Sequence, residues 1–300
     1  MSFSYNVKKE LAAKAEAPKH CRVAQLSAMA AFCAEYKDGK VIFRHENELV
    51  PGVIKELLSA AFSVSEADCE TAPGKLILAN REKAEQLLMG IKWMTAGPDG
   101  IRFERKPVSA ILMRNDCCKK AYLRGAFLCA GSVNDPNGAY HFEIVCKYPE
   151  EAEAVAGILK GFSLDVKSIE RKKNRVVYLK DGSNITDALN LMGAFTAQMD
   201  FYNIMILKDM RNNVNRKVNC ETANLKKTVA ASVEQIKDIE YIRDNFGLEA
   251  LKEGLREVAR LRLENPDASL KDLGEMLDPP LGRSGVNHRL KAISEFAKTQ

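Results

Sequence analysis

The sequence predicts an α+β protein, in which a two-lobed domain with pseudo-two-fold symmetry precedes an all-α helix-turn-helix domain. Three observations lead to this fold class. A pattern of small and apolar residues recurs 97 residues further along the chain. Each copy is followed by strand-like and helix-like runs in the same order, as expected for two similar lobes rather than a solenoid. From residue 248 onward the apolar residues follow helical spacing alone.

The clearest copy of the repeat lies at residues 120–132, Lys-Ala-Tyr-Leu-Arg-Gly-Ala-Phe-Leu-Cys-Ala-Gly-Ser. It predicts a helix with Gly125, Cys129 and Ala130 on successive turns of one side. Residues 25–35 have the same pattern. Because small side chains let another helix backbone approach closely, we expect these two helices to pack against each other at a pseudo-dyad.

The same elements follow both helices. A turn and a strand come next, at 41–43 in the first copy and 140–145 in the second, and a helical run ends near residue 63 or 163. The turn signal Gly-Pro-Asp-Gly at 97–100 divides the lobes, giving 1–97 and 98–210. Further expected elements are helices over 3–17, 51–62, 81–94 and 185–210, a strand at 76–79 and a hairpin over 166–180.

The paired small-residue helices resemble those of the LAGLIDADG homing-endonuclease fold, in which each helix carries a carboxylate at its base. Aligned on Leu-x-Gly, the acid positions hold Cys33 and Ala130. Neither side chain can bind a hard divalent cation, which requires oxygen ligands. The resemblance therefore implies lobes that keep the packing of the fold and lack its catalytic residues and metal.

Composition excludes several classes of protein. The hydrophobic fraction of 46% and charged fraction of 28% are ordinary for a globular chain, and no apolar run is long enough for a membrane span. The first residues do not form a signal peptide, and eight cysteines without a CxxC pair indicate reduced thiols in a cytoplasm. Nucleotide-binding, metalloprotease and serine-hydrolase motifs are missing, and the four histidines lack metal-ligand spacing. We expect no enzyme activity, cofactor or small-molecule ligand.

Residues 211–240 form a basic, asparagine-rich segment that we expect to be a linker. Its first part holds five cations against one acid, together with five asparagines. Such side chains hydrogen-bond phosphate oxygens and gain from counterion release. An ordinary linker with solvated charge is the alternative, and composition does not separate the two. The candidate DNA-backbone contacts are Arg211, Arg216, Lys217, Lys226 and Lys227.

The last part, 241–300, predicts a helix-turn-helix domain. A helix over 248–263 has Leu255, Val258, Ala259 and Arg262 at its repeat. Ser269 should cap a short helix over 270–277, because serine is a favoured N-cap residue. A Pro-Pro turn then interrupts the chain, and the final helix follows over 285–298 with Ser284 as its cap.

The final helix has an apolar side, formed by Val286, Leu290 and Ile293, and a polar side. A polar, basic start of the last helix is typical of DNA recognition by a helix-turn-helix. The turn is longer than usual, and three-helix bundles that bind no DNA are common, so that alternative stays open. The candidate DNA contacts are Arg283, Ser284, Asn287, His288, Lys291 and, at the margin, Arg289.

Two long motifs make the resemblance specific: 211–228, Arg-Asn-x-x-Asn-Arg-x-Val-Asn-Cys-Glu-Thr-Ala-Asn-Leu-x-Lys-Thr, and 277–290, Leu-Asp-Pro-Pro-Leu-x-x-Ser-Gly-Val-Asn-His-Arg-Leu. With the degenerate lobes, they resemble the WhiA family of bacterial sporulation and cell-division regulators over essentially the whole chain. The resemblance implies a cytoplasmic, nucleoid-associated protein that binds double-stranded DNA through a helix-turn-helix at about 268–300. It implies transcription regulation with effects on cell division and chromosome segregation. Other transcription or division proteins are further candidate partners; a membrane is not.

Two other functions are alternatives. A nuclease would need an acid near the second motif, where Asp135 follows it, but the Asn-Asp-Pro-Asn-Gly sequence around Asp135 is fully explained as a turn. A protein-interaction scaffold is the other alternative, because lobes without an active site still offer a saddle for DNA or for protein.

Overall fold

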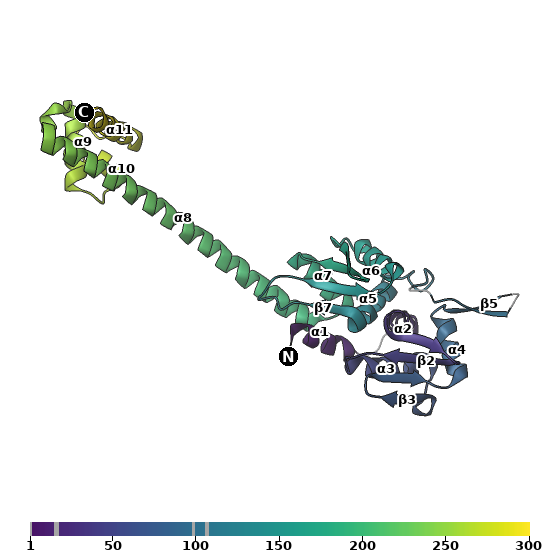
Figure 1. The fold of residues 1–300 in the computed structure, drawn as a ribbon. Coiled ribbons are helices and arrows are strands. Elements are labelled where there is room, and N and C mark those ends of the chain that lie inside the picture. The colour runs from purple at the N-terminus through teal and green to yellow at the C-terminus, as the bar shows by residue number, and fades with distance from the viewer. Residues whose placement is uncertain (1, 15–17, 98–99, 106–107) are drawn as a thin grey trace. The chain divides into compact units, whose positions relative to one another are not determined.

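The computed structural model describes residues 2–14, 18–97, 100–105 and 108–300 (Figure 1). The chain divides into two compact units, Met1–Asp209 and Met210–Gln300. The middle of the expected turn at 97–100 and the end of the expected helix at 3–17 lie outside the described residues. Among the helices that are described, none has the length and apolar character needed to cross a membrane.

The first lobe is built around an antiparallel sheet of order β1-β2-β4-β3. Val41 and Phe43 of β2 are buried, whereas their neighbours along the strand are not, because alternate side chains point to opposite faces. Its elements are α1 (Phe3–Ala12), α2 (Lys19–Cys33), β1 (Ala34–Lys37), β2 (Lys40–Arg44), α3 (Leu49–Phe62), η1 (Glu66–Asp68), β3 (Cys69–Ala72), β4 (Lys75–Leu78), α4 (Arg81–Gly90) and the hairpin of β5 (Met94–Gly97) and β6 (Gly100–Phe103).

The second lobe repeats this arrangement, with the sheet order β7-β8-β10-β9. The corresponding strands occupy the corresponding places, which confirms the predicted two-lobed fold. Its elements are α5 (Asp116–Ala130), β7 (Gly131–Val133), β8 (Phe142–Cys146), α6 (Pro149–Gly161), β9 (Lys167–Arg171), β10 (Asn174–Leu179) and α7 (Gly182–Met192).

Helices α2 and α5 pack against each other in the middle of the first unit (Figure 1). A Cβ added to Gly125 would lie 2.6 Å from the carbonyl oxygen of Gln25 and 3.0 Å from the Cβ of Ala28. Because no side chain fits there, the glycine lets the two backbones approach. The predicted role of the small residues is confirmed.

Residues 185–210 were expected to form one helix, but the helix is interrupted at Gly193. Gly193 adopts a left-handed conformation (φ 88°) and ends α7, a conformation that glycine reaches without steric cost. Helix α8 (Phe195–Phe246) starts two residues later. The carboxylate of Glu10 in α1 accepts hydrogen bonds from the backbone N–H groups of Thr196 and Ala197, at 2.7 and 3.0 Å, and so caps the start of α8.

The segment 211–240, expected as a linker, is helical throughout, because it belongs to α8. Neither proline nor glycine occurs between 195 and 246, so nothing in the local sequence ends the helix. Every residue from 210 to 231 is exposed, and the next buried residues of the helix are Ser232, Ile239 and Ile242.

The second unit has its own small core, to which α8 contributes Ile239 and Ile242. The expected helix at 248–263 is split into η2 (Leu248–Ala250) and α9 (Glu253–Glu264). Helices α10 (Leu270–Glu275) and α11 (Arg283–Thr299) complete the unit. The other buried core residues are Leu251, Val258, Ala259, Leu273, Leu277, Val286, Leu290 and Ile293.

The two predicted caps have different outcomes. Ser269 caps α10 as predicted, since its Oγ accepts a hydrogen bond from the Asp272 N–H at 3.3 Å and the Asp272 carboxylate accepts one from the Ser269 N–H at 3.0 Å. The prediction that Ser284 caps the last helix is wrong. Helix α11 begins two residues earlier than predicted, at Arg283, with Gly282 as its N-cap and no side-chain cap.

Candidate nucleic-acid interface

The polar side of α11 keeps most of the predicted DNA contacts together. Arg283, Ser284, His288 and Lys291 are exposed and Asn287 is half-buried. Val286, Leu290 and Ile293 anchor the opposite side in the core. The helix therefore presents a polar, basic surface from its first turn onward.

Arg289 does not belong to this surface. Its Nη1 donates a hydrogen bond to the carbonyl oxygen of Gly254 in α9, at 3.0 Å. A Cβ on Gly254 would lie 3.4 Å from the guanidinium carbon, so Arg289 packs directly on the α9 backbone. In this structure the side chain of Arg289 fixes α11 on α9, and its contact with a DNA groove or a phosphate stays a prediction.

A groove of about 540 Å³ runs between α8, α10 and the start of α11. Lys227, a predicted backbone contact, lies in its wall together with Arg283 and Asn287, two predicted contacts of the final helix. Lys227 is more than 50 positions away from the other two in the sequence. The remaining lining residues, which the sequence did not single out as contacts, are Thr228, Ala231, Ser232, Gln235, Arg262, Ser269, Leu270 and Lys271.

Arg262 lines the groove and holds the loop between α9 and α10 in place. It is 2% exposed, and its Nη1 donates to the carbonyl oxygen of Ala268 at 2.7 Å. Burial lowers the pKa of its guanidinium below the usual value. Ser232 of α8 donates to the Pro266 carbonyl oxygen in the same loop, at 2.6 Å. In the sequence, this role was indicated by an arginine at a position where the helical spacing of α9 predicts an apolar residue.

Helical geometry sorts the five predicted DNA-backbone contacts, all of which lie on α8, into two groups. Lys217, Asn224, Thr228 and Ala231 follow one another at intervals of seven, four and three residues, so they lie on the same side of α8. Because Thr228 and Ala231 line the groove, Lys217 is on the groove side of the helix. Arg216 is eleven residues, close to three full turns, before Lys227 and shares its side. By the same spacing Arg211 and Lys226 point to the opposite side of the helix.

None of these five α8 cations has a described carboxylate within ion-pair distance. On the sheets of the two lobes, by contrast, several cations do lie near carboxylates. Arg44 pairs with Glu35 at 3.0 Å and Lys40 with Glu70 at 3.2 Å in the first lobe. In the second, Arg175 lies 3.5 Å from Glu170 and Arg171 lies 3.8 Å from Glu143. An anion approaching these sheets therefore meets partly neutralised charge.

The former acid positions are the last residues of the paired helices, Cys33 of α2 and Ala130 of α5. The thiol of Cys33 donates to the Met29 carbonyl oxygen at 3.0 Å, and the Cys129 sulfur lies 3.8 Å from that of Cys33. Sulfur and methyl groups thus stand where the endonuclease fold carries carboxylates.

Asp135 behaves as a turn residue. Its Oδ1 accepts hydrogen bonds from the backbone N–H and the side-chain amide of Asn137, at 2.8 and 2.9 Å. These bonds hold the pKa of Asp135 below its ordinary value. The geometry is that of an Asx turn, in agreement with the interpretation of the sequence.

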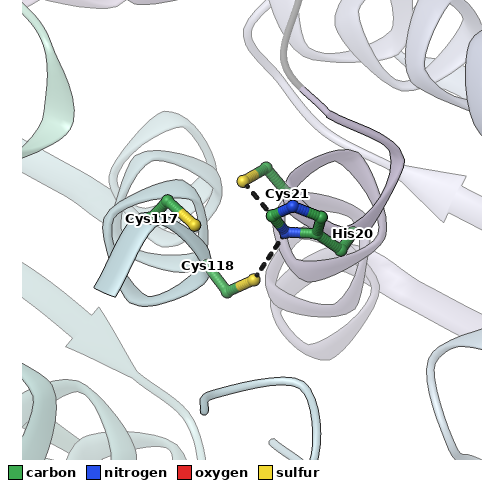
Figure 2. A group of neighbouring side chains, drawn as sticks. All are labelled: His20, Cys21, Cys117 and Cys118. Carbon is green, nitrogen blue, oxygen red and sulfur yellow. Dashed lines mark hydrogen bonds between the residues drawn. The ribbon is translucent and has the colours of Figure 1, made fainter. Parts of the chain in front are cut away.

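The structure also brings together four residues that the sequence did not connect, His20, Cys21, Cys117 and Cys118 (Figure 2). The two pairs are 97 positions apart, so no local spacing rule for metal ligands includes them.

Comparisons with known proteins agree with this architecture. The family model of the WhiA LAGLIDADG-like domain matches residues 119–211, and that of the WhiA C-terminal HTH domain matches residues 214–297. A probable cell division protein WhiA of Lachnospira eligens is 48% identical, over 99% of this chain and 96% of the relative. The corresponding protein of Lachnoclostridium phytofermentans is 42% identical, over 99% and 98%.

Among solved structures, full-length DUF199/WhiA from Thermatoga maritima matches with a TM-score of 0.58 and 25% identity, over 100% of this chain and 99% of that one. Its agreement over the full length supports the order of a LAGLIDADG-like domain and a helical C-terminal domain. On the strength of the full-length relatives and of both domain models, the chain belongs to the WhiA family.

Proposed function

We propose that this protein is a DNA-binding transcription regulator that acts in cell division, and that its C-terminal unit holds the DNA. The observation that carries the proposal is the groove in which Lys227 lies beside Arg283 and Asn287 at the start of α11. In a helix-turn-helix the first residues of the last helix meet the base edges in the major groove. The family model of a helix-turn-helix domain over 214–297 supports the same assignment.

The groove divides into two kinds of contact. Asn287 offers an amide that pairs with adenine, so it is the candidate for reading bases. Lys217, Lys227 and Arg283 supply unpaired charge for phosphates, which carry no sequence information. The start of α11 has no side-chain cap, and the free N–H groups of a helix N-terminus favour a phosphate. His288 and Lys291 extend the contact along the helix.

The biological setting comes from the relatives, which are named probable cell division proteins. We assign roles in chromosome segregation and, in sporulating relatives, in sporulation as part of the same proposal. A transcription regulator of this kind works on the nucleoid in the cytoplasm.

The lobes do not cleave DNA in this proposal. Hydrolysis of a phosphodiester with metal ions needs carboxylates to hold the ion, and Cys33 and Ala130 occupy those positions. Plasmid and genomic DNA incubated with the protein and Mg²⁺ or Mn²⁺ should remain uncut. Protein-dependent nicking that Asp135→Asn abolishes would show an active nuclease.

The decisive experiment is protection mapping of genomic DNA fragments with the full chain. We expect short protected sites that disappear with Asn287→Ala and persist with Lys298→Ala, a change at the exposed far end of the same helix. Protection that extends beyond one helix-turn-helix footprint would show that the lobes also touch DNA. A folded protein that protects no fragment would identify the C-terminal unit as a protein-interaction module.

A further inference from the structure

The paired helices of the first unit begin with equivalent residue pairs. Helix α2 starts at Lys19 and α5 at Asp116, so His20-Cys21 and Cys117-Cys118 are the second and third residues of the two helices. The repeat that relates the lobes, 97 residues, also relates these pairs. Each lobe thus contributes two potential metal ligands at the same structural position.

The four ligand atoms converge between the helices (Figure 2). All lie within 4.8 Å of one another. The Nδ1 of His20 is 3.1 Å from the Cys118 sulfur and 3.4 Å from the Cys21 sulfur. Around a tetrahedral zinc ion, with Zn–S near 2.3 Å and Zn–N near 2.0–2.1 Å, ligand atoms stand roughly 3.5–3.8 Å apart. Small side-chain movements therefore bring all four to ligand distance.

The surroundings suit a metal held by thiolates. Cys21 and Cys118 are each 4% exposed and pack with Ala24 and Ala121, whereas His20 and Cys117 are exposed. The outer pair gives an ion a way in from solvent, and the inner pair shields it afterwards. Both pairs lie in the first turn of a helix, where the dipole stabilises negative charge.

We propose that His20, Cys21, Cys117 and Cys118 form a structural zinc site of the Cys₃His type. Three soft thiolates and one imidazole are the donor set that tetrahedral zinc prefers, and all four positions come from the protein, so no open position is left for catalysis. The ion joins the starts of α2 and α5 and thereby fastens the two lobes together. It lies at the opposite end of these helices from Cys33 and Ala130, the former acid positions.

Metal analysis of the purified full chain tests the site. Elemental mass spectrometry should find one zinc ion per chain in the wild type and none in the double variant Cys117→Ser/Cys118→Ser. The matched controls are Cys69→Ser and Cys220→Ser, which change cysteines in β3 and α8 and should keep the zinc. Iron in place of zinc, or zinc retained by the double variant, would overturn the proposal.

A second measurement does not depend on the variants folding. The wild-type chain, stripped of metal by a chelator, should take up one equivalent of Co²⁺ with the absorption bands of tetrahedral thiolate coordination. Zinc should then displace the cobalt. Adding zinc back to the metal-free chain, at a hundredfold excess over the dissociation constant for zinc, should raise the melting temperature of the first unit by roughly 5–10 °C. A folded metal-free protein that binds neither ion would refute the site.

Discussion

The two compact units use positive charge in different ways. In the first unit, several sheet cations pair with carboxylates, as Arg44 does with Glu35 and Arg175 with Glu170. In the second, Lys217 and Lys227 on α8 and Arg283 on α11 have no described carboxylate within ion-pair distance. The net charge of +5 conceals this difference. What matters for binding an anionic polymer is unpaired charge gathered on one surface, and only its placement in space reveals it.

The units also differ in their cores. One continuous core runs through both lobes of the first unit, whereas ten buried residues form that of the second. A small core leaves less stability in reserve, because a smaller domain buries a smaller fraction of its surface on folding. The C-terminal unit is therefore the one in which a single truncation should have the larger consequence.

The largest effect is expected for Leu290→Ala, which empties a site that is 1% exposed in the second core. Such a truncation costs about 2–5 kcal/mol. Hydrogen exchange should show reduced protection in α9 and α11 and unchanged protection in α2 and α5. Leu225→Ala, at a position 65% exposed on α8, is the matched control and should cost less than about 0.5 kcal/mol. An equal reduction of protection in both units would contradict the separation of their cores.

The reverse test is Gly125→Ala in the first unit. The new methyl group would lie 2.6 Å from the Gln25 carbonyl oxygen, so the helices must separate, at a cost of about 1–3 kcal/mol. In α6, Gly157 has no atom within 4 Å of an added Cβ, and Gly157→Ala should stabilise the protein by about 0.5–1 kcal/mol. Chemical unfolding of both variants measures the difference. A tolerated Gly125→Ala would show that α2 and α5 pack less closely than the structure indicates.

Base reading should be confined to the second unit. We expect Asn287→Ala to weaken binding to a preferred site by about 1–3 kcal/mol and binding to random duplex much less. Binding isotherms on both DNAs give the comparison, with Lys298→Ala as the unaffected control. Equal weakening on the two DNAs would mean that Asn287 does not read bases.

The smallest effect is expected for the cations of α8. Lys217→Ala/Lys227→Ala removes two cations from the groove side and should weaken specific and random binding alike. The slope of log K against log salt should become shallower by about 0.9 for each phosphate that the protein no longer neutralises. Arg211→Ala/Lys226→Ala removes the same charge from the opposite side and should change the slope less. If the two double variants behave identically, net charge rather than placement governs binding.

Much of the fold could be predicted because its signals are local. The small residues around Gly125 fix the packing helices, and the apolar positions Val286, Leu290 and Ile293 fix the buried side of α11. The two long motifs already indicated the family that the relatives confirm. The break at Gly193 was missed because an apolar pattern on both sides concealed a left-handed residue.

By itself, then, the sequence determined the repeat, the polar side of the last helix and the absence of carboxylates at Cys33 and Ala130, since each can be recognised from the order of residues along the chain. Only the tertiary structure decided which residues meet. It joined Lys227 to Asn287, turned Arg289 onto the Gly254 carbonyl, and brought His20-Cys21 to Cys117-Cys118. These contacts depend on how helices distant in sequence pack, and packing is set by the shapes of whole faces rather than by any local spacing of residues.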